Sequence, residues 1–204
     1  MSNKNAGSRH AERVRAFQAI YSLFFSTVDS EKTLGKRFMR MLYAKPSTLG
    51  QANAARAFDS EADAEGENFA GESGALNPFA FPADAGQDAE EVVVPSDFSA
   101  QPEGFAWELV RGAWQNQVEL DGLITDFSQN WRLDRMGKVE LALLRLAAYE
   151  LLYRDDVPGK VVINEAIELS KIFGDDSSRS FVNGILDAIV KALDSGELKR
   201  GGIL

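Results

Sequence analysis

The sequence predicts an all-α protein of about six helices, interrupted by one long acidic insertion. Apolar residues recur at steps of three and four through both ends of the chain, which is the period of an amphipathic helix. No convincing strand pattern appears, and most linkers are short, which favours antiparallel neighbours. We therefore expect a basic arm with the first helices at 1–43, the insertion at 44–104 and a helical core at 105–204.

The first two helices are expected at residues 9–28 and about 30–43. The apolar face of the first is made by residues one helical turn apart: Val14, Phe17, Tyr21, Phe24 and Val28. In the second, Asp29 or Ser30 is the expected N-cap. Its inner face would carry Leu34, Phe38 and Leu42, and Pro46 would close it.

The remaining helices follow Phe105. One runs to about Trp131, with Val118 on its inner face, and the next covers about 135–154 and is apolar nearly all round. Such a helix is expected at the centre of a bundle. Pro158 then suits the first turn of a third helix, which Gly174 would end. The inner positions of this helix and the last one are Val162, Ala166, Leu169 and Phe173, then Val182, Leu186, Ile189 and Leu193. Asp175 to Ser178 supply N-cap oxygens for the last helix.

The insertion is rich in Ala, Gly, Asp, Glu and Ser and shows no sustained period. Low hydrophobicity with charge of one sign is typical of a segment that cannot fold alone. Two apolar clusters interrupt it, NPFAFP and EEVVVP. One interpretation is a mobile loop that docks loosely. The other is a short binding motif, or an acidic mimic of nucleic acid that shields a basic region.

Charge is distributed unevenly along the chain, whose formal net charge is -9. Residues 57–104 hold twelve Asp or Glu and no Lys or Arg, so the rest of the chain carries +3. Residues 1–45 carry nine Lys or Arg against three acidic residues. The acidic total therefore hides a basic N-terminal region, which is compatible with a nucleic-acid partner.

Catalytic and metal-binding patterns are missing. Cysteine is absent and His10 is the only histidine, in a polar terminus unsuited to a triad. Glu165 and Glu168 are interpreted as a solvated face, with Lys171 beyond Glu168. Asn164 and Asn183 interrupt apolar runs, and we expect each to make a buried helix-to-helix hydrogen bond. We expect no enzyme, no cofactor and no metal.

The basic N-terminus includes Lys4, Arg9, His10 and Arg13, and Arg9 lies one helical turn before Arg13. Guanidinium groups side by side suit phosphate oxygens. Reading unpaired bases also needs aromatic groups for stacking. Arg179 and Phe181, at the turn before the last helix, are candidates. Plain solvated surface remains the alternative for the basic residues.

The run from Glu140 to Asp187, ELALLRLAAYELLYRDDVPGKVVINEAIELSKIFGDDSSRSFVNGILD, closely resembles the NusB family of transcription antitermination factors. Residues 105–124 and the QAIY of the first helix fit as well. The resemblance covers roughly 8–43 and 105–204, but not the acidic insertion. It implies six to seven helices in two small bundles, no catalysis and a cytoplasmic protein.

The resemblance also implies partners. These are the boxA element of ribosomal RNA transcripts, the ribosomal protein NusE and the RNA polymerase elongation complex, which would then resist termination. Carried over by position, RNA contacts fall on Arg9, His10 and Arg13, on the turn from Ser177 to Ser180, and on Phe181. The NusE-facing positions fall on Tyr21 and Glu140. His10 stands where the family often has a basic residue, and Ser177 and Ser180 replace residues often charged.

Two alternatives remain at this stage. Some RNA methyltransferases carry a NusB-like N-terminal domain, but the sequence shows neither a nucleotide-binding motif nor a cysteine nucleophile. The other alternative is a structural adaptor that uses the same surface for protein contacts alone, including as a homodimer that hides its RNA face.

Overall fold

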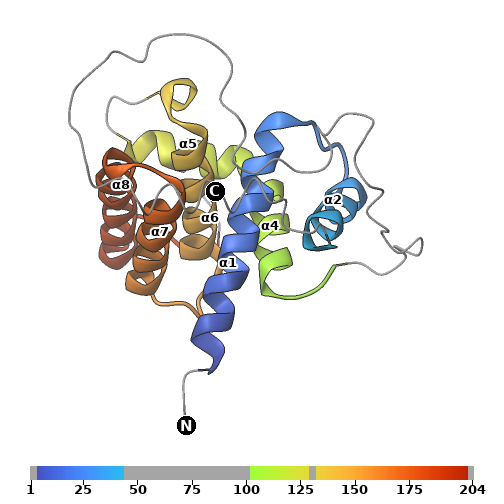
Figure 1. Cartoon of the computed structure of the whole chain (residues 1–204). Helices are drawn as coiled ribbons and strands as arrows, with labels where there is room; N and C mark the ends of the chain where they lie inside the picture. The colour runs from blue at the N-terminus through green and yellow to red at the C-terminus, as the bar shows by residue number, and fades with distance from the viewer. Residues whose placement is uncertain (1–3, 44–101, 129–131, 202–204) are drawn as a thin grey trace, which may run out of the picture. The chain divides into compact units, whose positions relative to one another are not determined.

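The computed structural model describes residues 4–43, 102–128 and 132–201 (Figure 1). The all-α prediction is confirmed, because these residues form seven α-helices and two short 3-10 helices and no strand. The chain divides into two compact units, Met1–Phe38 with Gln101–Leu204, and Met39–Ala100. The acidic insertion, with its NPFAFP and EEVVVP clusters, lies almost wholly outside the described residues. None of the described helices combines the length and apolar character needed to span a bilayer.

Helix α1, Lys4–Ser22, begins earlier and ends earlier than the predicted 9–28. A 3-10 turn, Leu23–Phe25, follows it, and Ser26 is extended. The end is local in origin, because the Ser22 hydroxyl donates a hydrogen bond of 2.6 Å to the Ala19 carbonyl. Side chains that bond the preceding turn weaken the regular helix. Val28 therefore does not share the apolar face of α1.

Helix α2, Glu31–Tyr43, has the predicted start. The backbone N–H of Thr33 donates to the Ser30 hydroxyl at 3.3 Å, as expected of an N-cap. Leu34 is buried, and the Phe38 ring centroid lies 5.5 Å from that of Trp107. These contacts join the first part of α2 to the unit that carries α1. The other expected inner residue, Leu42, belongs to the second unit.

The single helix predicted from Phe105 to about Trp131 is wrong. Two helices occupy the described part of this region, α4 at Phe105–Gln115 and α5 at Gln117–Phe127, and Asn116 separates them. The Asn116 side-chain amide donates to the Gly112 carbonyl at 2.8 Å, which offers the backbone an alternative to helical bonding. As a result Val118, expected to face inward, is 88% exposed.

Helix α6, Lys138–Tyr153, is the central helix that the sequence predicts. It follows a 3-10 turn at Leu133–Arg135 and contacts α1, α4, α5, α7 and α8. Gly112 of α4 faces the ring of Tyr149 on α6, and an added Cβ there would lie 1.9 Å from Cζ of that ring. This glycine therefore leaves room for the Tyr149 ring between the two helices.

Helices α7, Gly159–Phe173, and α8, Asp176–Ser195, lie side by side against α6 (Figure 1). Pro158 immediately precedes α7, and Gly174 ends it as predicted. The inner stripes are confirmed at the residues that are buried, namely Val162, Ala166, Leu169, Val182, Leu186 and Ile189. Asn164 and Asn183 are both exposed, so the buried hydrogen bonds expected of them are wrong. Each sits on the outer face of its helix, where an amide is solvated.

Candidate functional site

The basic residues near the start of α1 have different surroundings. Arg9 keeps 47% of its side chain exposed, with Nη2 3.4 Å from an oxygen of Asp156. His10 Nδ1 lies 2.8 Å from Oε2 of Glu165 on α7. Arg13, by contrast, is 3% exposed. Lys4 is the first residue of α1, and its side chain lies outside the described part of the chain.

Arg13 is bound inside the protein by Glu150 of α6. Its Nε donates to Oε1 at 2.9 Å and its Nη2 donates to Oε2 at 2.7 Å, and the Glu150 side chain is 2% exposed. The Nε–Nη2 edge of the guanidinium group is thus engaged far from solvent. This placement removes Arg13 from the surface residues that we expected to contact RNA.

The energetics of this pair favour positioning over net stability. Burial raises the pKa of Glu150, and the hydrogen bonds and charge of Arg13 oppose that shift. Removing two charges from water offsets much of their attraction. Once both side chains are buried, however, removing either one leaves the charge of the other unpaired in an apolar environment. The pair therefore fixes α1 against α6 at one position.

The ring of Phe105, the first residue of α4, lies beneath three guanidinium groups. The Cζ atoms of Arg9, Arg13 and Arg154 are 5.3, 5.1 and 5.0 Å from its centroid. Arg9 and Arg13 thus share a ring contact, but only Arg9 is exposed, so the two guanidinium groups are not presented together at the surface. Cation–π attraction of this kind contributes about 0.5–1 kcal/mol at exposed sites. The start of α1 is therefore attached to α4 as well as to α6.

Glu165 was interpreted as part of a solvated face, and this is wrong. Its side chain is 23% exposed, it holds His10, and one oxygen lies 3.9 Å from Nη1 of Arg13. Helix α1 was not expected to cover this part of α7. The carboxylate therefore orients two of the basic residues of α1.

Glu168, one turn further along α7, is exposed as predicted. Lys171 donates to it at 2.7 Å and lowers its pKa, and the charges of His10 and Arg179 lower the pKa further. His10 belongs to α1 and Arg179 to α8. Both helices contact α7, α1 through the His10–Glu165 bond and α8 by packing along it, although they are far apart in the sequence.

The turn between α7 and α8 is held by the predicted N-cap. Oδ1 of Asp175 accepts hydrogen bonds from the Ser178 N–H and the Ser177 hydroxyl, both at 2.7 Å. The Asp175 N–H donates in return to the Ser178 hydroxyl at 3.3 Å, which completes a capping box. Bonds from Ser177 and then Ser178 lower the pKa of Asp175 to about 2.

The first turns of α8 bring together the other residues expected to contact RNA. Ser177 and Ser180 are exposed, and Arg179 and Phe181 are half-buried. Val182 is fully buried and anchors this face of α8 in the core. Phe181 therefore lies beside the apolar stripe rather than on it.

The two residues expected to face NusE, Tyr21 and Glu140, lie near each other. Tyr21 is 7% exposed, and burial raises its pKa, with a further increase from the charge of Glu140. Glu140 also accepts a hydrogen bond from the buried Ser178 hydroxyl. A single carboxylate therefore links the expected protein-facing residues to the capped turn of α8.

Sequence reasoning missed an exposed aromatic edge next to Tyr21. Phe25 is 43% exposed, and Lys138 Nζ lies 4.4 Å from its ring centroid. Arg145 Cζ lies 5.0 Å from the centroid of Phe24 and pairs with Asp121 through two bonds of 2.7 and 2.8 Å. The sequence feature that could have revealed this edge is the run Leu23–Phe25, in which Phe25 falls outside the apolar stripe of α1.

The described residues suit the binding of a partner. Nowhere among them do three or more His, Asp or Glu side chains gather so that they could hold a metal ion. What they do present is a set of guanidinium and hydroxyl donors that suit phosphate oxygens, and an aromatic ring that suits a base.

Comparisons with known proteins agree on one family. The NusB family model matches residues 83–191. "Transcription antitermination protein NusB" of Nitratidesulfovibrio vulgaris (strain DSM 19637 / Miyazaki F) is 44% identical over 195 residues, which cover 96% of this chain and 94% of that protein. The protein of the same name from Oleidesulfovibrio alaskensis is 66% identical over 99 residues, 48% of this chain and 64% of that protein. The solved structure of T. maritima NusB has 26% identity and a TM-score of 0.54, over 93% of this chain and 97% of that one.

Proposed function

The chain belongs to the NusB family, and from this premise we propose that it is an RNA-binding transcription antitermination factor. In this proposal it binds the boxA element of ribosomal RNA operon transcripts together with NusE. The complex then joins the RNA polymerase elongation complex in the cytoplasm and makes it resist termination. The name shared by its relatives supports antitermination, and no catalytic step is required.

The observation that carries the RNA-binding part is that α1 and α8 both lie against α7. His10 of α1 bonds to Glu165 of α7, and α8 packs along α7. The basic start of α1 and the capped start of α8 can therefore contact one continuous strand. Acidic side chains nearby moderate the positive potential, which favours modest affinity for RNA alone and a requirement for NusE.

Individual residues then have separate roles. Lys4, Arg9, His10 and Arg179 contact phosphates, and the Ser177 and Ser180 hydroxyls add hydrogen bonds. Phe181 stacks on one base, a contact that contributes on the order of 1–3 kcal/mol. Arg13 acts from within the protein, because its pair with Glu150 fixes the helix that carries Arg9 and His10.

The protein-facing part is the surface around Tyr21 and Glu140, extended by Phe25 and Lys138. An exposed aromatic with an adjacent cation suits the aromatic and charged content of protein interfaces. Tyr21 lies mostly beneath this surface and supports its ring contacts. A homodimer formed through the RNA-facing side remains the competing arrangement.

The test is a gel shift on boxA RNA and a scrambled control, with and without NusE, at two salt concentrations. We expect preference for boxA that increases with NusE and weakens with salt. Phe181→Ala should weaken RNA binding roughly 5- to 150-fold while sparing the NusE complex. Phe25→Ala is the reciprocal variant, which should weaken the NusE complex while sparing RNA binding without NusE.

Two outcomes would overturn the proposal. Equal weak binding to both RNAs with NusE present would remove sequence-specific recognition. If Phe181→Ala abolished NusE binding too, with the fold intact by circular dichroism, the assignment of separate surfaces would be wrong. Gel filtration of the free protein distinguishes a monomer from the homodimer.

A further inference from the structure

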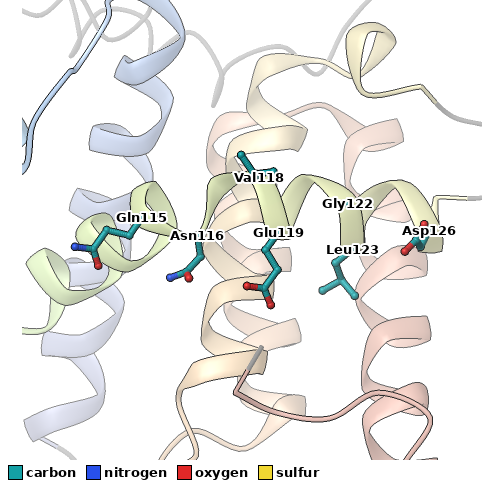
Figure 2. Close-up of a pocket in the computed structure, with 7 residues that line it drawn as sticks. All are labelled: Gln115, Asn116, Val118, Glu119, Gly122, Leu123 and Asp126. Carbon is teal, nitrogen blue, oxygen red and sulfur yellow. The ribbon is translucent and has the colours of Figure 1, made fainter. Parts of the chain in front are cut away.

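Helix α5 borders an open groove that none of the proposed contacts uses. The groove encloses about 430 Å³ and runs from Gln115 to Asp126. Figure 2 shows the side chains of Asn116, Glu119 and Leu123 on one side of the helix, about one turn apart. Over this length α5 spans about 16 Å. An extended peptide of about five residues covers the same distance.

The floor and rim of the groove are apolar in part. Leu123 is 1% exposed and Val118 is 88% exposed. Between them in sequence lies Gly122, where an added Cβ would meet nothing within 4 Å. The absence of a side chain there leaves the groove open along the middle of α5. A ligand can therefore reach the helix surface beside the exposed Val118, whereas Leu123 is buried beneath it.

The charged lining residues are acidic. Glu119 and Asp126 border the groove, and among the lining residues that the structure describes none is Lys or Arg. The Tyr153 hydroxyl donates to Glu119 at 2.7 Å and holds this carboxylate in position. Burial, followed by this bond, raises the pKa of Tyr153 to about 12, so the hydroxyl keeps its proton at neutral pH. A negative rim of this kind repels nucleic-acid phosphates and attracts cationic side chains.

We propose that the α5 groove binds a short, extended, basic segment of a partner protein. Its Lys or Arg side chains pair with Glu119 and Asp126, and an aliphatic side chain packs on the exposed Val118. The proposal is independent of the RNA-binding one, because the groove is formed by α4 and α5 whereas the RNA contacts belong to α1 and α8. The partner is a protein and not the transcript, because of the sign of the charge.

The probe is a fluorescein-labelled peptide of sequence lysine–leucine–lysine–serine–lysine, and a peptide with glutamate in place of lysine is its control. Fluorescence anisotropy with the full chain should show salt-sensitive binding of the lysine peptide alone. Amide chemical shifts in NMR spectra should change along Gln115 to Asp126. Changes confined to other helices would overturn the proposal.

A charge-removing variant tests the acidic rim. The double variant Glu119→Gln and Asp126→Asn should weaken peptide binding about fivefold or more. Gln at 119 can still accept the Tyr153 hydrogen bond, so the fold is retained. Asp194→Asn with Glu197→Gln removes two exposed charges from the end of α8 and its following turn. This matched control should bind the peptide as the unmodified chain does. Equal losses of peptide affinity in the two double variants would mean that the net charge of the chain, and not the rim of the groove, attracts the peptide.

A second variant fills the groove without changing charge. Gly122→Gln places a side chain in open space within a helix, which raises helix propensity and leaves the fold intact. We expect at least fivefold weaker peptide binding. Gly184→Gln, at a glycine of α8 with equally open surroundings, should have no effect. The proposal is overturned if Gly122→Gln binds normally, or if sedimentation shows a dimer that only Gly122→Gln dissociates, since a second copy would then be the occupant.

Discussion

Helices α1 and α8 both contact α7, but different interactions hold their starts in place. Arg13 in α1 bonds to Glu150, which lies 137 residues away in the sequence. At the start of α8, Asp175 bonds to Ser177 and Ser178 within the same turn. One half of the proposed RNA surface therefore depends on the packing of the whole helical unit. The other half depends on a local cap.

The Arg13–Glu150 pair and the Asp175 cap also differ in their exposure to water. The Arg13–Glu150 pair is almost fully buried, so the loss of one partner leaves a charge in an apolar environment. Asp175 is exposed, so water replaces part of whatever a substitution removes. Mutation at α1 should therefore affect global stability, and mutation at α8 should affect mainly the turn.

Glu150→Gln should have the largest effect. It keeps the shape of the side chain but removes the charge that balances Arg13, and breaking a buried pair costs about 3–5 kcal/mol. Urea denaturation followed by circular dichroism measures the loss. Glu168→Gln removes an exposed partner of Lys171 and is the matched control, with a much smaller expected loss.

Replacing both buried charges sharpens this comparison. Arg13→Met with Glu150→Leu should recover most of the stability lost in Glu150→Gln, because a well-packed apolar pair avoids the desolvation penalty. If Glu150→Gln cost no more than Glu168→Gln, the pair would not be what fixes α1.

Asp175→Ala should have an intermediate effect, since the loss of an N-cap costs about 1 kcal/mol. The folded pKa of Asp175 is lowered to about 2, so its contribution is fully present above its ordinary pKa of 3.8. It is lost as the pH falls through about 2. Thermal denaturation at pH 6 and pH 2 should therefore show a larger difference from the unmodified protein at pH 6 than at pH 2. An equal difference at both pH values would contradict the assignment of Asp175 as an ionised cap.

The same contrast explains what could be predicted from the sequence. Asp175 was predicted as a cap because capping depends on residues three positions apart. The partner of Arg13 was not, because no periodicity relates residues 13 and 150. A partial signal existed, since Arg145 and Glu150 are the only charges on the apolar run from Leu141 to Tyr153. Each buried charge requires a partner, and the structure supplies Asp121 and Arg13.

The errors in the predicted helix after Phe105 and in the predicted exposure of Glu165 have the same cause, since side-chain contacts are not visible in a periodic pattern. The apolar period through Phe105 to Ile124 is continuous, so it predicts one helix, whereas the Asn116 side chain bonds its own preceding turn and divides it. Glu165 looked solvated because its own helix shows only an amphipathic pattern. Its burial depends on α1, which covers it from 155 residues away. Patterns within one element therefore gave the fold class and the caps, and contacts between elements determined which site residues are available.

Arg9→Gln should have the smallest effect on stability, because Arg9 is half exposed and its pair with Asp156 lies at the surface. We expect a change of no more than about 0.5 kcal/mol. If Arg9 contacts a phosphate, RNA affinity should fall about three- to tenfold and the salt dependence should lose about one unit of slope. Arg132→Gln, at a 73% exposed arginine beyond the proposed surface, is the control and should leave both quantities unchanged. An unchanged slope for Arg9→Gln would assign the start of α1 a structural role alone, so that only the capped turn of α8 would remain as the RNA-contacting region.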